Sequence, residues 1–199
     1  MLSSAFFSGP HGGGKTTLID RLLDTSDRYR PPAFEIDFLS EFRSFPALED
    51  WERCLLRLYH RMYIAQSNTE PSEPGTCTLV SRGVRDSEAY IRAYGKLGII
   101  PAEKVRILEH VLAGYRQPCP TVLLNPPLEV VRERLGGRRK AKVRAQRDAV
   151  FSFEDTDDFL VALWEAFEDM SSREDVLLLR DNEAEDIARV RQWLAGTAS

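Results

Sequence analysis

The sequence has 199 residues, of which 43% are hydrophobic and 29% are charged, and its formal net charge at pH 7 is −4. This length allows one well-buried domain and is too short for two comfortable ones. No apolar run approaches the roughly 18 residues of a membrane span, and the N-terminus lacks the basic and apolar regions of a signal peptide. The three cysteines are scattered without C-x-x-C spacing, which argues against a disulfide framework or a zinc site. We therefore expect a single-domain cytoplasmic protein.

The first two predicted elements are a strand at residues 2–8 and a helix from 14 to about 23. The residues between them and at the helix start fit the phosphate-loop pattern G-x-x-x-x-G-K-[ST] at every fixed position. They are Gly9, Pro10, His11, Gly12, Gly13, Gly14, Lys15, Thr16 and Thr17. The glycines permit positive φ and bring backbone N–H groups close to an anion at the helix N-terminus. The competing interpretation is a glycine-rich turn with a chance lysine.

This loop predicts the chemistry of the donor. Lys15 is expected to reach the β- and γ-phosphates of a nucleoside triphosphate as a point charge. The Thr16 hydroxyl is expected to ligate Mg²⁺. ATP with Mg²⁺ is therefore the expected cofactor pair, although no motif separates ATP from GTP.

The rest of the chain alternates between short apolar runs and amphipathic stretches. A second strand is predicted at 33–37, after the break at Pro31-Pro32, and the clearest loop is at 68–76. Further strands are predicted at 77–81, 121–124 and 176–179. Helices are predicted at about 48–66, 86–96, 101–112, 128–135, 156–170 and 183–194. Five such strands alternating with helices predict an α/β fold with a parallel sheet flanked by helices on both faces.

Polar residues follow several of the predicted strands, where parallel sheets bind their ligands. They are Asp37 and Glu41 after the second strand, Ser81 and Arg82 after the third, and Asn125 after the fourth. Arg82 and Asp86 lie four residues apart and would project into one cleft, where an arginine can bind phosphate or carboxylate bidentately. The alternative is a salt bridge that closes the start of a helix.

A basic segment lies at residues 132–147, which hold eight basic residues and one acidic residue although the protein as a whole is acidic. Gly136 and Gly137 stand just before Arg138 and are suited to act as the hinge of a closing lid, predicted at about 136–152. Such a lid excludes water and protects a kinase from hydrolysing its donor. Nucleic acid is the competing partner, but the segment lacks interleaved aromatic residues for base stacking.

Taken in order, four stretches resemble the thymidylate kinase and deoxynucleoside kinase group of P-loop kinases. They are the glycine loop, Ser40-Glu41, the R-G-x-x-D-S-x-A-Y stretch from Arg82 to Tyr90, and the run from Asn125 to Leu135. The resemblance implies the P-loop nucleoside triphosphate hydrolase fold, with five parallel strands and a small arginine-rich lid in one domain, 1–199. It also implies transfer of phosphate from ATP to a nucleoside or nucleoside monophosphate, and a homodimer.

The resemblance assigns roles to individual residues. Arg82 would hold the acceptor, Glu41 would lie near the acceptor hydroxyl, and Arg138 or Arg139 would be the lid arginine that meets the transferred phosphate. Ser81 departs from the group, which has Asp or Glu before the arginine. The missing carboxylate would then come from Asp37, Glu41 or Asp86, and we favour Glu41 over Asp37 as the base.

The predicted substrate-binding residues are Asp37, Glu41, Arg82, Asp86 and Tyr90, with Tyr90 or Phe42 available to stack on a base. The expected partner is a small-molecule acceptor, with no membrane and no nucleic acid. Two alternatives remain: a kinase acting on another small-molecule hydroxyl, such as an antibiotic, and a regulatory NTPase module that acts with a protein partner.

Overall fold

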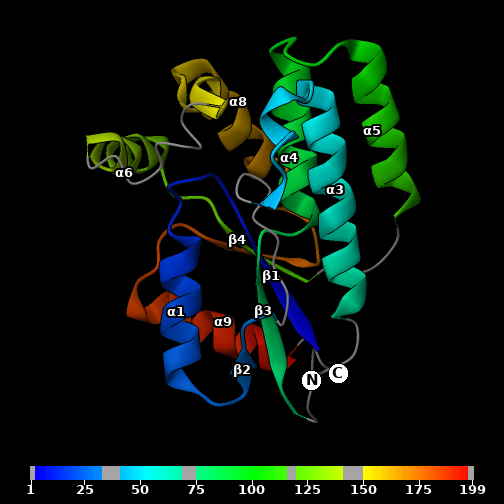
Figure 1. Ribbon diagram of the computed structural model, residues 1–199. Coiled ribbons are helices and arrows are strands. Elements are labelled where there is room, and N and C mark those ends of the chain that lie inside the picture. The colour runs from blue at the N-terminus through cyan, green and yellow to red at the C-terminus, as the bar shows by residue number, and fades with distance from the viewer. Residues whose placement is uncertain (1–2, 33–40, 69–74, 116–119, 141–149, 197–199) are drawn as a thin grey trace.

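The computed structural model describes residues 3–32, 41–68, 75–115, 120–140 and 150–196. Within these ranges five parallel strands form one sheet in the order β2-β3-β1-β4-β5. The strands are β1 (Ser4–Ser8), β2 (Tyr29–Arg30), β3 (Cys77–Ser81), β4 (Thr121–Leu124) and β5 (Val176–Leu179). The N-terminal strand β1 lies in the centre of the sheet (Figure 1). The predicted five-stranded parallel sheet is confirmed.

Helices cover both faces of this sheet, as predicted. In Figure 1, α1 and α9 lie on one face, and α3, α4, α5 and α8 lie on the other. The helices of the described part are α1 (Lys15–Thr25), α3 (Asp50–Ser67), α4 (Val84–Lys96), α5 (Ala102–Gly114), α6 (Leu128–Lys140), α8 (Asp157–Glu168) and α9 (Ala184–Gly196). Two short 3-10 helices, η1 (Phe45–Ala47) and η2 (Ser152–Asp155), precede α3 and α8. No helix in these ranges is both long enough and apolar enough to span a bilayer.

The alternation of side chains along β1 explains the two-sided core. Successive residues of a strand point to opposite faces. Ala5 and Phe7 pack in the cluster with α1 and α9, whereas Phe6 packs in the cluster with α3, α4 and α8. All three are at most 2% exposed. A central strand that is apolar on both faces therefore requires helices on both sides.

Two elements differ from the sequence prediction by more than two residues. The second strand of the sheet is Tyr29–Arg30, before the proline pair, and it pairs with Cys77 and Thr78 of β3. The strand predicted at 33–37 lies outside the described residues.

Helix α6 does not end at residue 135 but continues through Gly136 and Gly137 to Lys140. Glycine lowers helix stability without forbidding helix, and the basic residues in the last turn interact favourably with the helix dipole. The predicted lid at 136–152 therefore begins as helix, and its residues 141–149 lie outside the described ranges.

Candidate active site

The phosphate loop connects β1 to α1 in a conformation that requires glycine. Gly9, Gly12 and Gly14 have φ of 139°, 86° and 101°, a region that residues with side chains rarely occupy. A Cβ atom on Gly9 would lie 2.1 Å from the carbonyl oxygen of Leu124 at the end of β4. Gly13 has no positive φ, but a Cβ there would lie 2.9 Å from the Pro10 oxygen. Three of the four glycines thus supply positive φ, and Gly13 is required for its close contact.

Lys15 begins α1 and is 6% exposed. Its Nζ donates hydrogen bonds to the carbonyl oxygens of Gly9 at 2.7 Å and Pro10 at 2.9 Å. These contacts keep the ammonium group beside the loop, where it can meet phosphate. Thr16 is exposed at the helix start. One hydroxyl oxygen there, together with phosphate oxygens and water, fits the oxygen ligands that Mg²⁺ prefers.

Arg134 of α6 contacts the backbone of the phosphate loop. Its Nη1 donates to the Gly13 carbonyl oxygen at 3.0 Å, and its Nη2 lies 3.4 Å from a carboxylate oxygen of Asp181. Because the N–H and C=O of a trans peptide point in opposite directions, this bond turns the Gly14 N–H away from Arg134. Arg134 thus helps orient a donor of the anion cradle. The sequence placed it in the basic segment without a specific role.

Arg82 follows β3 and has a strained backbone. Its φ of 70° lies in the left-handed region, which costs a non-glycine residue about 1–3 kcal/mol. Its N–H still bonds to the Phe7 oxygen at 2.9 Å, and its guanidinium lies 6.0 Å from the centre of the Tyr90 ring. Burial acts to lower the pKa of Arg82, but Tyr90 and Asp86 outweigh it and raise the pKa above its ordinary value. Arg82 is therefore a permanent cation.

Asp86 is fully buried at the start of α4. Its Oδ2 accepts a hydrogen bond from the Gly83 N–H at 3.0 Å, so it caps the helix. Its Oδ1 is buried and has no hydrogen-bond partner among the described residues. Asp86 lies close enough to Arg82 to act electrostatically on it, and this cap closes the helix start. That both groups face one cleft stays a prediction.

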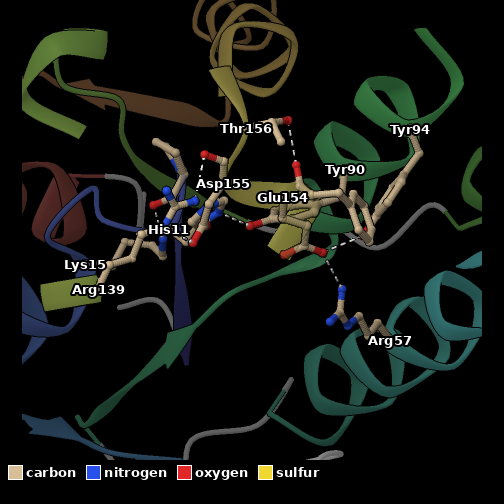
Figure 2. Close-up of polar contacts among 11 residues, drawn as sticks. His11, Lys15, Arg57, Tyr90, Tyr94, Arg139, Glu154, Asp155 and Thr156 are labelled. Carbon is tan, nitrogen blue, oxygen red and sulfur yellow. Dashed lines mark hydrogen bonds and ion pairs between the residues drawn. The ribbon is translucent and has the colours of Figure 1, made fainter. Parts of the chain in front are cut away.

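A second group of charged residues lies between α3, α4 and η2 (Figure 2). Glu154, 2% exposed, accepts a hydrogen bond from the Tyr94 hydroxyl at 2.5 Å and pairs with Arg57 at 3.3 Å. Arg61 donates to the Ser87 hydroxyl at 2.7 Å. Burial lowers the pKa of Arg61 to about 10, with help from the neighbouring Arg82 and Arg57 guanidinium groups and against the effect of Asp86.

His11, at a free position of the loop pattern, joins the phosphate loop to two other elements. It is 1% exposed. Its Nδ1 lies 2.9 Å from the Tyr90 hydroxyl, and its Nε2 lies 2.8 Å from Oδ1 of Asp155 in η2 (Figure 2). Oδ2 of Asp155 lies 3.3 Å from Nε of Arg139, and the Asp155 carbonyl oxygen accepts from Nη2 of Arg139 at 3.0 Å. The phosphate loop, Tyr90 and a predicted lid arginine thus meet through one histidine and one carboxylate.

The other predicted residues are placed less centrally. The Glu41 side chain is exposed, and it lies close enough to His60 to act electrostatically on it. Asp37 lies outside the described residues. Asn125 is buried and donates to Glu168 of α8 at 3.0 Å, which makes it a structural contact between β4 and α8.

Arg138 is partly exposed at the end of α6. Tyr90 is buried with Tyr94 and Phe159 against its ring, so stacking on a base would require these neighbours to move.

The sequence analysis did not single out Arg57, Arg61, Glu154 or Asp155. The two arginines belong to an amphipathic helix, where basic residues usually form a solvated face. Glu154 and Asp155 precede a helix, where acidic residues are commonly N-terminal caps. Only the packing of η2 against α4 and the phosphate loop distinguishes them from ordinary helix-end acids.

Sequence comparison finds no match to a protein-family model and no match among curated proteins. Solved structures do match. Deoxyadenosine kinase from M. mycoides with the products dCMP and dCDP superposes with a TM-score of 0.71 at 11% identity, covering 97% of this chain and 99% of that one. The chain has the fold of these kinases. The dATP-bound structure of that enzyme gives a TM-score of 0.66 at 10% identity, covering 96% of this chain and 98% of that one. Its dCTP-bound structure gives 0.63 at 12% identity, covering 98% of each chain.

These matches confirm the predicted P-loop kinase fold over nearly the whole chain. At such low identity they concern the fold and not the substrate. The nucleotides named above are bound by the M. mycoides enzyme.

Proposed function

We propose that this protein is a kinase that transfers the γ-phosphoryl group of ATP to a nucleoside or nucleoside monophosphate. The observation that carries the proposal is the meeting of three parts at His11 and Asp155: the phosphate loop, the acceptor-side Tyr90 beneath Arg82, and Arg139 from the end of α6. A hydrolase transfers phosphate to water and needs no residues that hold a second substrate. The neighbours of the same fold bind nucleotides, which agrees with this choice.

Phosphoryl transfer depends mainly on positioning and on neutralising charge. The loop N–H groups and Lys15 would bind the donor phosphates. Arg82 would hold the acceptor, and Arg139 or Arg138 would meet the transferred phosphate. Thr16 would hold Mg²⁺, which when bound supplies further neutralisation of the phosphate charge. We also propose that the protein acts in the cytoplasm and as a homodimer.

The direct test is a transfer assay. Purified protein is incubated with ATP, Mg²⁺ and a panel of nucleosides and nucleoside monophosphates, and the products are followed by mass. We expect at least one acceptor to gain one phosphate. ATP binding without transfer to any of them would refute the proposal. A further panel of other small alcohols, including antibiotics, and an assay of protein-stimulated ATP hydrolysis would then separate the two alternatives.

Glu41→Gln is expected to lower kcat for transfer by about 10²-fold or more, because a general base contributes about 10²- to 10⁴-fold. ATP affinity should remain unchanged, since Glu41 follows the second strand and not the phosphate loop. Glu103→Gln, at an exposed position of α5, is the matched control and should leave both quantities at wild-type values. Wild-type kcat in Glu41→Gln would exclude Glu41 as the base, and Asp37→Asn and Asp86→Asn would then be the next variants to measure.

A further inference from the structure

The phosphate loop carries a buried histidine that the loop pattern does not require. His11 occupies one of the free positions, and its side chain is fully inaccessible to solvent. A buried imidazole must satisfy two ring nitrogens by hydrogen bonding, because burying an unpaired polar group costs free energy. Both nitrogens of His11 lie close to a polar group of another element. Nδ1 is within hydrogen-bond distance of the Tyr90 hydroxyl of α4, and Nε2 lies 2.8 Å from Oδ1 of Asp155 in η2, an ion-pair contact that lacks the alignment of a hydrogen bond.

The chemistry of these neighbours indicates which ring nitrogen of His11 carries the proton. An ionised carboxylate has no proton to donate, so the 2.8 Å contact between Nε2 of His11 and Asp155 favours a proton on Nε2. In neutral His11 the Nδ1 then accepts a hydrogen bond from the Tyr90 hydroxyl. The result is a directed chain from Tyr90 through His11 to Asp155. Because the Asp155 side chain is only 3% exposed, solvent competes little for this chain.

Each end of the chain contacts a group of the proposed reaction. Tyr90 lies beneath the guanidinium of Arg82, which would hold the acceptor. Asp155 contacts Arg139, which would meet the transferred phosphate. His11 itself belongs to the loop that would hold the donor. This chain of polar contacts therefore connects the donor side with the acceptor side through side chains that need not touch either substrate.

We propose that His11 and Asp155 are positioning residues for phosphoryl transfer. Asp155 fixes the orientation of the His11 ring, and His11 holds the phosphate loop at a set distance from Tyr90 and the acceptor. This inference rests on the proposed kinase function. Its physical basis is that transfer requires donor and acceptor atoms in near-attack geometry, where a displacement of about 1 Å costs about 10²-fold in rate.

The first test is a double-mutant cycle of Asp155→Asn and Tyr90→Phe. Each single variant should lower kcat by about 10-fold or more while the KM for ATP changes less than about threefold, because the loop N–H groups and Lys15 remain. The double variant should lose no more than the worse single variant, since both substitutions break the same chain.

Two matched controls should keep wild-type kcat. They are Asp157→Asn, a surface carboxylate paired with Arg132, and Tyr59→Phe on the exposed face of α3. Wild-type kcat in the single variants, or losses that multiply, would overturn the inference.

The second test examines the contacts of His11 by a measurement that does not depend on catalytic activity. The protein has three histidines, so ¹⁵N-histidine spectra are simple, and the signals missing from His11→Gln belong to His11. We expect Nε2 of His11 to be protonated, and its signals to shift in Asp155→Asn and in Tyr90→Phe. An unprotonated Nε2, or signals unchanged in both variants, would contradict the proposal even if Asp155→Asn folds poorly. A wild-type protein that phosphorylates no acceptor would refute the proposed function, whereas the spectra would still test the chain.

Discussion

Replacing Lys15 with alanine is expected to lower kcat for phosphoryl transfer by about 10²- to 10³-fold, the usual cost of removing one group that stabilises transition-state charge. Nucleotide affinity should fall as well, because the loop loses its point charge. The Gly9 carbonyl oxygen would also lose the Lys15 donor, whereas the Pro10 carbonyl oxygen would keep the Gly13 N–H at 3.0 Å. An unsatisfied buried acceptor costs about 1–3 kcal/mol, so a modestly lower melting temperature should accompany the loss. Single-turnover transfer, ATP titration and thermal unfolding measure the three effects.

Lys96→Ala is the matched control for this variant. Lys96 is an exposed lysine that pairs with Glu165 on the surface, and such pairs contribute about 0–1 kcal/mol. It should keep full transfer and almost full stability. If Lys15→Ala retained more than about a tenth of the wild-type kcat, Lys15 would not be the phosphate-binding lysine that the loop pattern predicts.

Gly9→Ala is expected to destabilise the protein by at least about 3 kcal/mol, since it combines backbone strain with overpacking. The new Cβ would lie 2.1 Å from the Leu124 carbonyl oxygen, and the φ of 139° disfavours any residue with a side chain. For a domain of this size that loss corresponds to about 10 °C in melting temperature. The loop must shift to relieve the contact, so ATP binding should be lost even in the folded fraction. Thermal unfolding with and without ATP separates the two effects.

Gly136→Ala provides the contrasting glycine. Gly136 lies within α6, and among the described residues no atom outside its neighbours and its own helix backbone lies within 4 Å of the position where its Cβ would be. Alanine is favoured over glycine inside a helix by about 1 kcal/mol, so this variant should be slightly more stable than the wild type. If Gly136→Ala and Gly9→Ala lowered the stability equally, the positive φ and close contact of Gly9 would not be the reason that alanine is disfavoured at that position.

The order and type of most elements could be predicted because the relevant patterns are local. The run that becomes β1 is apolar on consecutive residues, and the phosphate-loop pattern follows it immediately. The errors fall where local preference is weak. Gly136 and Gly137 are permissive residues that a helix tolerates, and the two-residue strand Tyr29–Arg30 is defined only by its pairing with β3.

The residues of the candidate site also divide into those that the sequence could predict and those that it could not. Lys15, Arg82 and Tyr90 were predicted because they stand at fixed distances from a motif or a strand end. Asp155 could not be predicted, since it is separated from His11 by well over a hundred residues and resembles an ordinary acid before a helix. Arg134 belongs to a run of basic residues, and only the packing of α6 against the loop separates it from the solvated ones.

By itself, the sequence determined that this protein has a phosphate loop on a parallel α/β sheet, because spacing, glycine content and strand periodicity are properties of neighbouring residues. The tertiary structure alone decided which charged groups meet that loop. Contacts such as His11 with Asp155, and Arg134 with Gly13, depend on how α6 and η2 pack, and packing brings together residues that have no relation in the chain.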